Sequence, residues 1–331
     1  MKLAQNLNKD LFTPEIKAVA NRDGYGEALK ALGQKLPRVV ALTADLSEST
    51  RTNLFAEAFP ERFIQCGVAE QNMASVASGL AAMGKIPFIA SYAMFSPGRS
   101  WEQVRTTIAY NNANVKIIGS HAGVSVGPDG ATHQAIEDIA LMRVMSNMIV
   151  LAPMDVHEAY KATMWAAEYV GPVYMRLARN ETPIVSTPES EFIFGKASVL
   201  MEKEEGANNS VAIISTGTLA YNALQAGKEL NESGIATSVT HFATIKPLDT
   251  EMLDRLAATH DILVTVEEHQ VACGLGSAIA EYLSATKPTR IIRLGIQDKF
   301  GQSGTPEELL AYYGLDAVSI VRTVKNALGQ G

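Results

Sequence analysis

The chain has 331 residues and a formal net charge of −7 at pH 7, and 47% of its residues are hydrophobic and 19% charged. This length predicts about two domains of roughly 150 residues each, and the composition indicates a globular protein with a large core. The negative charge argues against nucleic acid or a membrane surface as a partner, but phosphorylated small molecules stay open because local arginines decide their binding. No apolar run has the length of a membrane span or of a signal-peptide core, so we expect a cytoplasmic protein.

Runs of β-branched and aromatic residues alternate with helix-like segments along the first half of the chain. This alternation predicts a mainly parallel sheet that helices cover on both faces. The expected strands are 39–43, 62–66, 86–92, 115–119, 148–151 and 173–177. The expected helices pass through Ala28 and Leu29, run to Phe55, begin at Glu70, span 101–110, carry Ile136, Ile139, Ala140 and Val144, and begin at Asp155.

The composition changes between about Glu181 and Asn209, where Pro, Ser and Glu predict a linker with one edge strand. A second, smaller α/β set follows this linker. Its expected strands are 211–215, 236–241, 262–266 and 290–294, and its expected helices begin at Leu219, Asp249, Leu275 and Val318. We therefore predict an α/β fold of two domains, residues 1–187 and 188–331, each with a mainly parallel sheet flanked by helices.

The stretch Gly-Val-Ala-Glu-Gln-Asn-Met at 67–73 is the first candidate for a functional site. It opens a helix in which apolar residues recur at helical spacing, and the other residues are mostly small. Glu70 would lie in its first turn, at the strand-to-helix edge where open α/β sheets bind ligands. An acid at this position also stabilises the helix dipole, so the motif taken alone favours a structural role.

The loop 121–134 is the second candidate, because it follows an expected strand and carries His121, Asp129 and His133 between glycines. Glycines permit unusual backbone angles, and three titratable groups at one strand end make a functional role as plausible as a structural one. Cys66 and Cys273 lie in unrelated contexts, so we expect two packed small side chains and no metal or redox site.

The motifs 67–72 and 129–134, the latter reading Asp-Gly-Ala-Thr-His-Gln, together resemble the pyrimidine-binding domain of transketolase. The segment 266–276, Val-Glu-Glu-His-Gln-Val-Ala-Cys-Gly-Leu-Gly, resembles the C-terminal domain of the same family, where Gly274 and Gly276 suit close packing. The resemblance runs from about Asp23 to Leu328 but covers only part of a full-length transketolase. It implies the C-terminal subunit of a split transketolase.

The resemblance implies a reaction, cofactors and a partner. Such an enzyme moves a two-carbon ketol unit from a ketose phosphate to an aldose phosphate with thiamine diphosphate. A separate N-terminal subunit would hold the diphosphate and its Mg²⁺ or Ca²⁺, so this chain would supply no metal ligand, and we expect an α₂β₂ heterotetramer. The helix from Glu70 is the candidate for the central contact, which an Ala77→Arg variant would disrupt.

The resemblance also implies cofactor contacts. Glu70 matches the glutamate that hydrogen-bonds the aminopyrimidine ring of thiamine diphosphate and so activates it. Tyr92 aligns with an aromatic residue, Phe in many relatives, that stacks on this ring, and Phe95 would line the same pocket. These roles are implied by the family, and for Phe95 a place in the core is equally plausible.

Further residues match positions that contact the sugar. His121 and His133 match histidines that exchange protons with its oxygens, so with Glu70 they are the implied catalytic residues. Asp129 matches a carboxylate that reads a hydroxyl group. The residues that fall at the family's phosphate clamp are Arg22, Ser49 and Arg179. Ala122 stands where long-chain members often have Asp, which leaves donor selectivity open, and we expect structural roles for Glu267, Glu268 and His269.

Three alternatives stay open at this point. A relative of 1-deoxyxylulose-5-phosphate synthase tends to carry Arg in place of His121, in a shorter loop. A β subunit of a 2-oxo acid dehydrogenase has the same split layout but fits the 129–134 run less well. A non-catalytic scaffold is the third, and the intact set of Glu70, His121, Asp129 and His133 argues against it.

Overall fold

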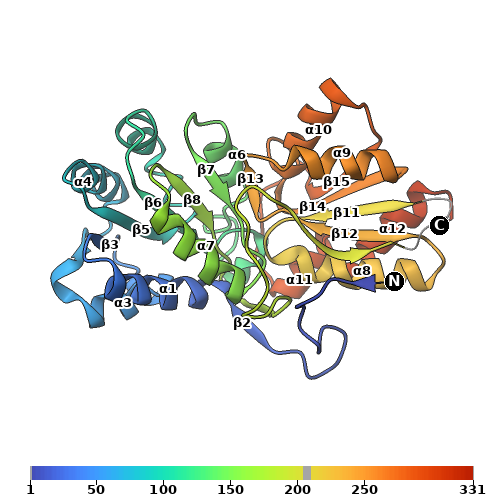
Figure 1. The fold of residues 1–331 in the computed structure, drawn as a ribbon, viewed down its shortest axis with the longest axis horizontal. Coiled ribbons are helices and arrows are strands. Elements are labelled where there is room, and N and C mark those ends of the chain that lie inside the picture. The colour runs from blue at the N-terminus through green and yellow to red at the C-terminus, as the bar shows by residue number, and fades with distance from the viewer. Residues whose placement is uncertain (1, 204–209, 331) are drawn as a thin grey trace.

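The computed structural model describes residues 2–203 and 210–330. In these ranges the chain forms a seven-stranded sheet, a six-stranded sheet and a small two-stranded sheet. The two large sheets lie side by side along the long axis of the molecule, each with helices on both faces (Figure 1). Most strand pairs in both are parallel. The predicted α/β fold with two mainly parallel sheets is confirmed.

The first sheet carries the segments that sequence motifs single out. Its strand order is β13-β7-β8-β6-β5-β3-β4, and all neighbours pair in parallel except β13 with β7. Its central strands are buried and rich in β-branched residues, as strands covered on both faces require. Its strands are β3 (Val39–Thr43), β4 (Phe63–Gln65), β5 (Ile86–Tyr92), β6 (Lys116–Ser120), β7 (Ile149–Leu151), β8 (Val173–Arg176) and β13 (Thr244–Lys246).

Helices α1 (Asn21–Lys35) and α7 (Val156–Glu168) pack together on one face of this sheet. They approach closely because Gly24 has no side chain: a Cβ there would lie 2.0 Å from the carbonyl oxygen of Val156. The opposite face is covered by α4 (Glu70–Ala82), by α5 (Trp101–Gln103) and by the π-helical segment η2 (Val104–Ala109). The core beneath this second face continues into residues of α9 and α10.

Shorter elements complete this part of the chain. They are α2 (Ser47–Thr50), α3 (Asn53–Ala58), the 3-10 segments η1 (Pro60–Arg62) and η3 (Val124–Asp129), and α6 (Asp138–Arg143).

The second sheet has the order β1-β10-β12-β11-β14-β15. Its strands are β1 (Lys2–Leu3), β10 (Ser198–Glu202), β11 (Val211–Ser215), β12 (Thr237–His241), β14 (Ile262–Gln270) and β15 (Ile291–Ile296). Its helical elements are η4 (Gly217–Leu219), α8 (Ala220–Glu232), α9 (Thr250–Thr259), α10 (Leu275–Thr286), α11 (Pro306–Tyr312) and α12 (Ala317–Ala327).

The two sheets exchange short strands. β1, at the start of the chain, pairs antiparallel with β10 in the second sheet, whereas β13 leaves the second set and pairs with β7 in the first. The strands β2 (Ala18–Ala20) and β9 (Glu181–Pro183) pair separately. Neither large sheet is therefore built from one continuous segment, and the division into residues 1–187 and 188–331 stays a prediction.

Several expectations differ from the structure. Ile136 precedes α6 rather than lying in it, and Val144 follows α6 with 73% of its surface exposed. Cys273 is exposed and Cys66 half-buried, so the expectation of two packed thiols is wrong for Cys273. The described part of the linker, residues 181–203, carries two strands, whereas 204–209 lie outside the described residues. Helix α11 has no counterpart among the predicted helices. None of the helices in the described ranges combines the length and the apolar character that a bilayer crossing needs.

Candidate active site

The predicted site residues follow neighbouring strands of the first sheet. The order β8-β6-β5-β3-β4 places Arg179, His121, Tyr92, Ser49 and Glu70 after successive parallel strands, hence at one edge of the sheet. The ends of β5 and β6 are level, because Tyr92 pairs with Ser120, the residue before His121. This carboxyl edge is where open α/β sheets bind ligands, so the topology supports the location inferred from the motifs.

Glu70 is the first residue of α4, and only 2% of its surface is exposed. The turn that leads to it contains Gly67 with a positive φ of 67°, and Ala69 donates its N–H to the Gly67 carbonyl at 2.7 Å. Its Oε2 is buried and has no hydrogen-bond partner among the described residues. A buried acceptor without a partner costs free energy, which a ligand that donates a proton to it would recover.

Four rings gather at the ends of β5 and β6. The Tyr92 ring stacks on the imidazole of His121 with centroids 3.8 Å apart and lies nearly parallel to Phe95 at 5.9 Å. His133 meets the ring of Phe95 edge-on at 5.5 Å. The structure thus brings together the two histidines and the two aromatic residues that the sequence assigned to the sugar and the cofactor.

Hydrogen bonds define the protonation of His121. Nη1 of Arg22 lies 3.2 Å from its Nε2, and because arginine only donates, Nε2 accepts. The proton is then on Nδ1, which donates to Ser120 Oγ at 2.9 Å. Burial, helped by the charges of Arg22, Arg179, Arg51 and His133, lowers the pKa of His121 to about 3. His121 is therefore neutral at physiological pH, with Nε2 as an acceptor and Nδ1 as a donor of hydrogen bonds.

His133 and Asp129 lie on the more open side of the same loop. His133 is half-buried, and its Nδ1 is 2.9 Å from Thr132 Oγ1, which leaves Nε2 without a hydrogen bond in the described ranges. Asp129 is exposed at the end of η3. Both side chains are thus accessible to a molecule that enters along the sheet edge.

Arginines surround His121. Nη1 of Arg22 also donates to the carbonyl oxygen of Ser49 at 2.7 Å, and Nη1 of Arg179 donates to that of Val126 at 2.8 Å. Nε of Arg22 is buried and makes no hydrogen bond with described residues. The three predicted clamp residues are therefore near the histidines, although Ser49 takes part through its backbone.

Residues of the C-terminal part of the chain contact the loop 121–134 and hold it in place. The carboxylate of Glu268 accepts the N–H of Ser125, and Nε2 of Gln134 donates to the carbonyl oxygens of Val124, Gly127 and Gln302 at 2.9–3.2 Å. Gly301 leaves room for this amide, since a Cβ there would lie 1.7 Å from the Oε1 of Gln134. Sequence reasoning did not single out Gln134 or Gly301; the place of Gln134 directly after His133 is the one local signal for its role.

The expected structural roles in the segment 266–276 agree with the contacts. Glu267 accepts the N–H groups of Leu275 and Gly276 at 2.7 and 2.8 Å, and Nε2 of His269 accepts the N–H of Ala140 at 3.3 Å. A Cβ at Gly274 would lie 2.0 Å from Oε2 of Glu267, which explains the glycine by close packing. The glutamates and the histidine of this segment are therefore engaged in contacts that join helices, whereas Cys273 is exposed.

Other features lie apart from the sheet edge. No recorded hydrogen bond or ring contact joins Glu70 to the histidine cluster in the part of the chain that the structure describes. In the same part, no group of three or more His, Cys, Asp or Glu side chains is placed to hold a metal ion.

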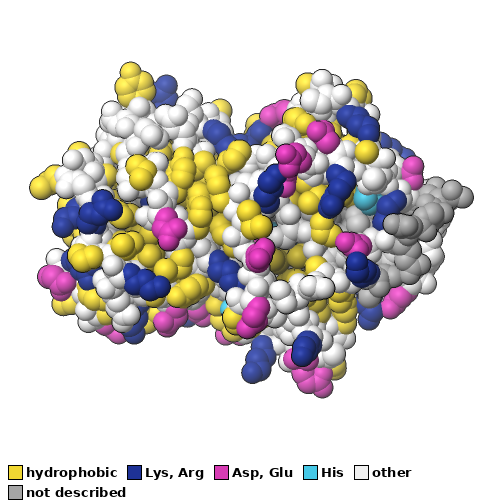
Figure 2. Space-filling view, in the orientation of Figure 1, with side chains coloured by type: hydrophobic (Ala, Val, Ile, Leu, Met, Phe, Trp, Pro, Cys, Tyr) yellow, Lys and Arg dark blue, Asp and Glu magenta, His cyan; other side chains and the backbone are white. Residues whose placement is uncertain are grey.

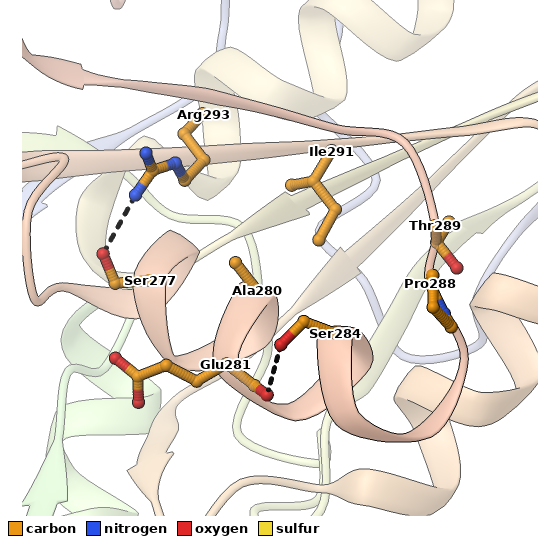
Figure 3. A pocket seen from close by; sticks show the side chains of 8 residues that line it. All are labelled: Ser277, Ala280, Glu281, Ser284, Pro288, Thr289, Ile291 and Arg293. Carbon is orange, nitrogen blue, oxygen red and sulfur yellow. Dashed lines mark hydrogen bonds between the residues drawn. The ribbon is translucent and has the colours of Figure 1, made fainter.

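An open hollow of about 540 Å³ lies between α10 and β15 (Figure 3), where Arg293 donates to Oγ of Ser277. It contains none of the predicted site residues.

Comparisons with known proteins give matches to both parts of the chain. The family described as transketolase, pyrimidine binding domain, matches residues 17–185, and the one described as transketolase, C-terminal domain, matches 200–320. A putative transketolase C-terminal section from Methanocaldococcus jannaschii is 47% identical over 92% of this chain and 94% of its own length. The 6-deoxy-6-sulfo-D-fructose transketolase subunit SqwH from a Clostridium species is 40% identical, over 91% of this chain and 92% of its own.

A solved structure gives the same result in three dimensions. A split gene transketolase, described as an inactive beta4 tetramer, superposes with a TM-score of 0.85 at 44% identity and covers 95% of this chain and 99% of its own.

Proposed function

The chain belongs to the transketolase family as the C-terminal section of a split transketolase, and we propose that it transfers a two-carbon ketol unit between sugar phosphates with thiamine diphosphate. The observation that carries this proposal is the buried, unpartnered Oε2 of Glu70 at the sheet edge that also bears His121 and His133. A pyrimidine ring that shares a proton with this oxygen would satisfy it. The pyrimidine-binding domain itself indicates the cofactor.

Bound thiamine diphosphate supplies the carbanion chemistry of ketol transfer. Toward it, this chain offers the carboxylate of Glu70 to a ring nitrogen and the aromatic surfaces of Tyr92 and Phe95. The rim of Tyr92 is polar, unlike that of phenylalanine, and one of its faces rests on His121. We assign the diphosphate and the Mg²⁺ or Ca²⁺ to the partner N-terminal subunit.

The remaining residues would bind the sugar. His121 is neutral, and its Nε2 accepts a hydrogen bond from Arg22, so it would accept from a sugar hydroxyl group only in place of that donor and would not protonate the sugar. His133, whose Nε2 makes no hydrogen bond with the described residues, is the better candidate for proton transfer, and the exposed Asp129 would read a hydroxyl group. Arg22, Ser49 and Arg179 would bind the phosphate of a donor such as xylulose 5-phosphate.

We propose that the exposed side of α4 contacts another subunit in an α₂β₂ assembly. Met83, just after the helix, is 79% exposed, and Val68, just before it, is 69% exposed. These two residues flank the two ends of α4, so a partner that lay along the helix would cover both. Figure 2 shows one face of the molecule, on which hydrophobic side chains are more frequent over the half with α1 and α7.

Because of the orientation of α4, Ala77→Arg is not a suitable test of this contact. Ala77 faces the core of its own domain with no exposed surface, so Ala77→Arg would unfold the chain rather than report on assembly. Ser75 lies on the exposed side. We expect Ser75→Arg to keep the fold but reduce the assembly size in light scattering, whereas Gln34→Arg, exposed on α1, changes neither. An unchanged assembly for Ser75→Arg would refute the contact.

The test of function is reconstitution. Thiamine diphosphate with Mg²⁺ is titrated by calorimetry into this chain alone and into its mixture with a candidate N-terminal subunit, and ketol transfer from xylulose 5-phosphate to ribose 5-phosphate is assayed. We expect tight binding and transfer only in the mixture. Tight binding by the chain alone would contradict the assignment of the diphosphate to the partner. Binding without transfer would favour another ketose donor, such as a sulfonated sugar, and no binding at all would favour a scaffold.

A further inference from the structure

Two hydrogen bonds join the start of α1 to the end of α2 beside His121. In the first, Arg22 donates to the carbonyl oxygen of Ser49 at 2.7 Å. In the second, Nε of Arg51 donates to Oδ1 of Asp23 at 2.5 Å. The two hydrogen bonds lie side by side, since Arg22 and Asp23 are consecutive and Ser49 and Arg51 are two residues apart. Arg51 is thereby fixed next to the clamp residues that the family resemblance identified.

The conformation of Arg51 is unusual for a residue whose role is only to link two helices. It occupies the left-handed region, with φ 64° and ψ 13°, at the C-terminal end of α2, where glycine or asparagine is favoured. Its Cβ lies so close to α1 that a Cβ at Gly26 would be 2.6 Å away. Strained backbone that is held by its surroundings is typical of binding sites.

The guanidinium of Arg51 retains free donors. Its side chain is 38% exposed, and Nη1 and Nη2 make no hydrogen bond with any described residue. Its charge is close enough to act on Arg22 and on His121, since it lowers the pKa of both. Arg22, Arg51 and Arg179 carry three positive charges and Asp23 one negative charge, which leaves a local excess of two positive charges, equal to the charge of a phosphate dianion.

We propose that Arg51 is a specificity-determining residue whose terminal N–H groups bind the phosphate at the far end of the sugar substrate, with Asp23 as the positioning residue that orients it. This proposal rests on the proposed function, because it concerns the same site. It adds to the predicted clamp a residue that sequence reasoning did not single out. If Arg51 and Asp23 only connected α1 and α2 and bound no phosphate, replacing Arg51 would reduce the stability of the chain. It would then affect phosphorylated and neutral substrates equally.

The test compares a phosphorylated with a neutral donor. In the enzyme assembled with its N-terminal subunit, kcat and KM are measured for xylulose 5-phosphate and for erythrulose, which has no phosphate. We expect Arg51→Met to lower the ratio of the two kcat/KM values about tenfold, mainly through the KM of the phosphorylated donor, as loss of a charge-assisted hydrogen bond would. Arg51→Lys retains the charge and should recover part of the ratio.

A matched control and a binding measurement separate this proposal from the proposed function. Arg38→Met, at an exposed arginine beyond the other end of α1, should leave the ratio unchanged. Calorimetric titration of ribose 5-phosphate and of ribose into the assembly measures phosphate discrimination without turnover, so it is informative even if no ketol transfer occurs. Equal loss for both donors in Arg51→Met, or unchanged discrimination in both measurements, would overturn the role of Arg51.

Discussion

Glu70 and Glu267 are both buried glutamates beside the N-terminus of a helix, α4 and α10 respectively. Glu267 uses its two oxygens to accept the first N–H groups of α10, from Leu275 and Gly276. Glu70 leaves Oε2 without a partner in the described ranges. Both carboxyl groups lie beside a helix N-terminus. The two oxygens of Glu267 accept hydrogen bonds, whereas Oε2 of Glu70 at the sheet edge accepts none from the described residues.

The difference separates a structural site from a binding site. Folding alone favours saturation, because each unpaired buried polar group reduces stability. An unsatisfied acceptor at the sheet edge is available to a ligand, and binding would recover the stability that it costs. Exchanging each carboxylate for an amide therefore gives opposite expectations for the two residues.

Glu70→Gln has the largest expected effect. Loss of the proton-sharing carboxylate should lower kcat of the assembled enzyme by about 10²–10⁴-fold, the range typical of a lost acid–base group. The free energy of unfolding of the chain should stay the same or rise, because a neutral amide is easier to bury than an unpaired carboxylate. Steady-state kinetics and urea unfolding measure the two quantities. Full activity with reduced stability would mean that Glu70 is structural.

Glu267→Gln should show the reverse pattern. One of the two N–H groups of α10 would face an amide N–H instead of an oxygen, so we expect the free energy of unfolding to fall by about 1–3 kcal/mol. The kcat of the folded, assembled enzyme should be unchanged, since Glu267 contacts only α10 in the recorded hydrogen bonds. A loss of kcat at unchanged stability would contradict the distinction between the two glutamates.

Gly301→Ala tests whether the C-terminal domain positions the loop that carries His121 and His133. The new Cβ would lie 1.7 Å from Oε1 of Gln134, so the amide must move and release carbonyl oxygens of the loop that carries His121 and His133. We expect about a tenfold loss of kcat/KM, because small displacements of positioning groups are costly to catalysis. Lys299→Ala, exposed in the same loop, is the control and should have wild-type kinetics. Equal kinetics for both variants would show that the C-terminal domain does not position the site.

The sequence predicted most strands and helices because their periodicity is local. It did not predict the exchange of β1 and β13 between sheets, since Lys2 pairs with Glu202 and Thr244 with Leu151, and local periodicity carries no information on such distant pairing. It also ended β14 at Val266, whereas the strand continues through the polar residues Glu267 to Gln270. Buried partners for those polar groups, supplied by tertiary contacts, extend the strand beyond its apolar run.

For the site, the motifs identified the residues and the topology placed them at one edge, but side-chain geometry was not predictable. The spacing of apolar residues indicated a buried side of α4, but it could not show whether that side packs on its own domain, as Ala77 does, or against another subunit. Nor could the sequence show that His121 is held neutral, since its low pKa depends first on burial and then on the charge of Arg22, which lies about a hundred residues earlier in the chain and contacts its Nε2 at 3.2 Å. The hydrogen bond between Arg51 and Asp23 likewise could not be predicted from the sequence.

The neutral state of His121 predicts that the stability of the chain falls as the pH is lowered. Burial lowers its pKa to about 3 in the folded chain, against 6.5 for the ordinary side chain, so between these values the unfolded chain binds the additional proton. His121 therefore contributes a loss of stability as the pH falls from 6.5 toward 3, at most about 1.4 kcal/mol per pH unit. His121→Gln should weaken this decline in urea unfolding at pH 6.5, 5.5 and 4.5, while both proteins show the same slope above pH 7.5. An unchanged decline would mean that the imidazole is charged in the folded chain, and the hydrogen bond from Arg22 to its Nε2 would then be wrong.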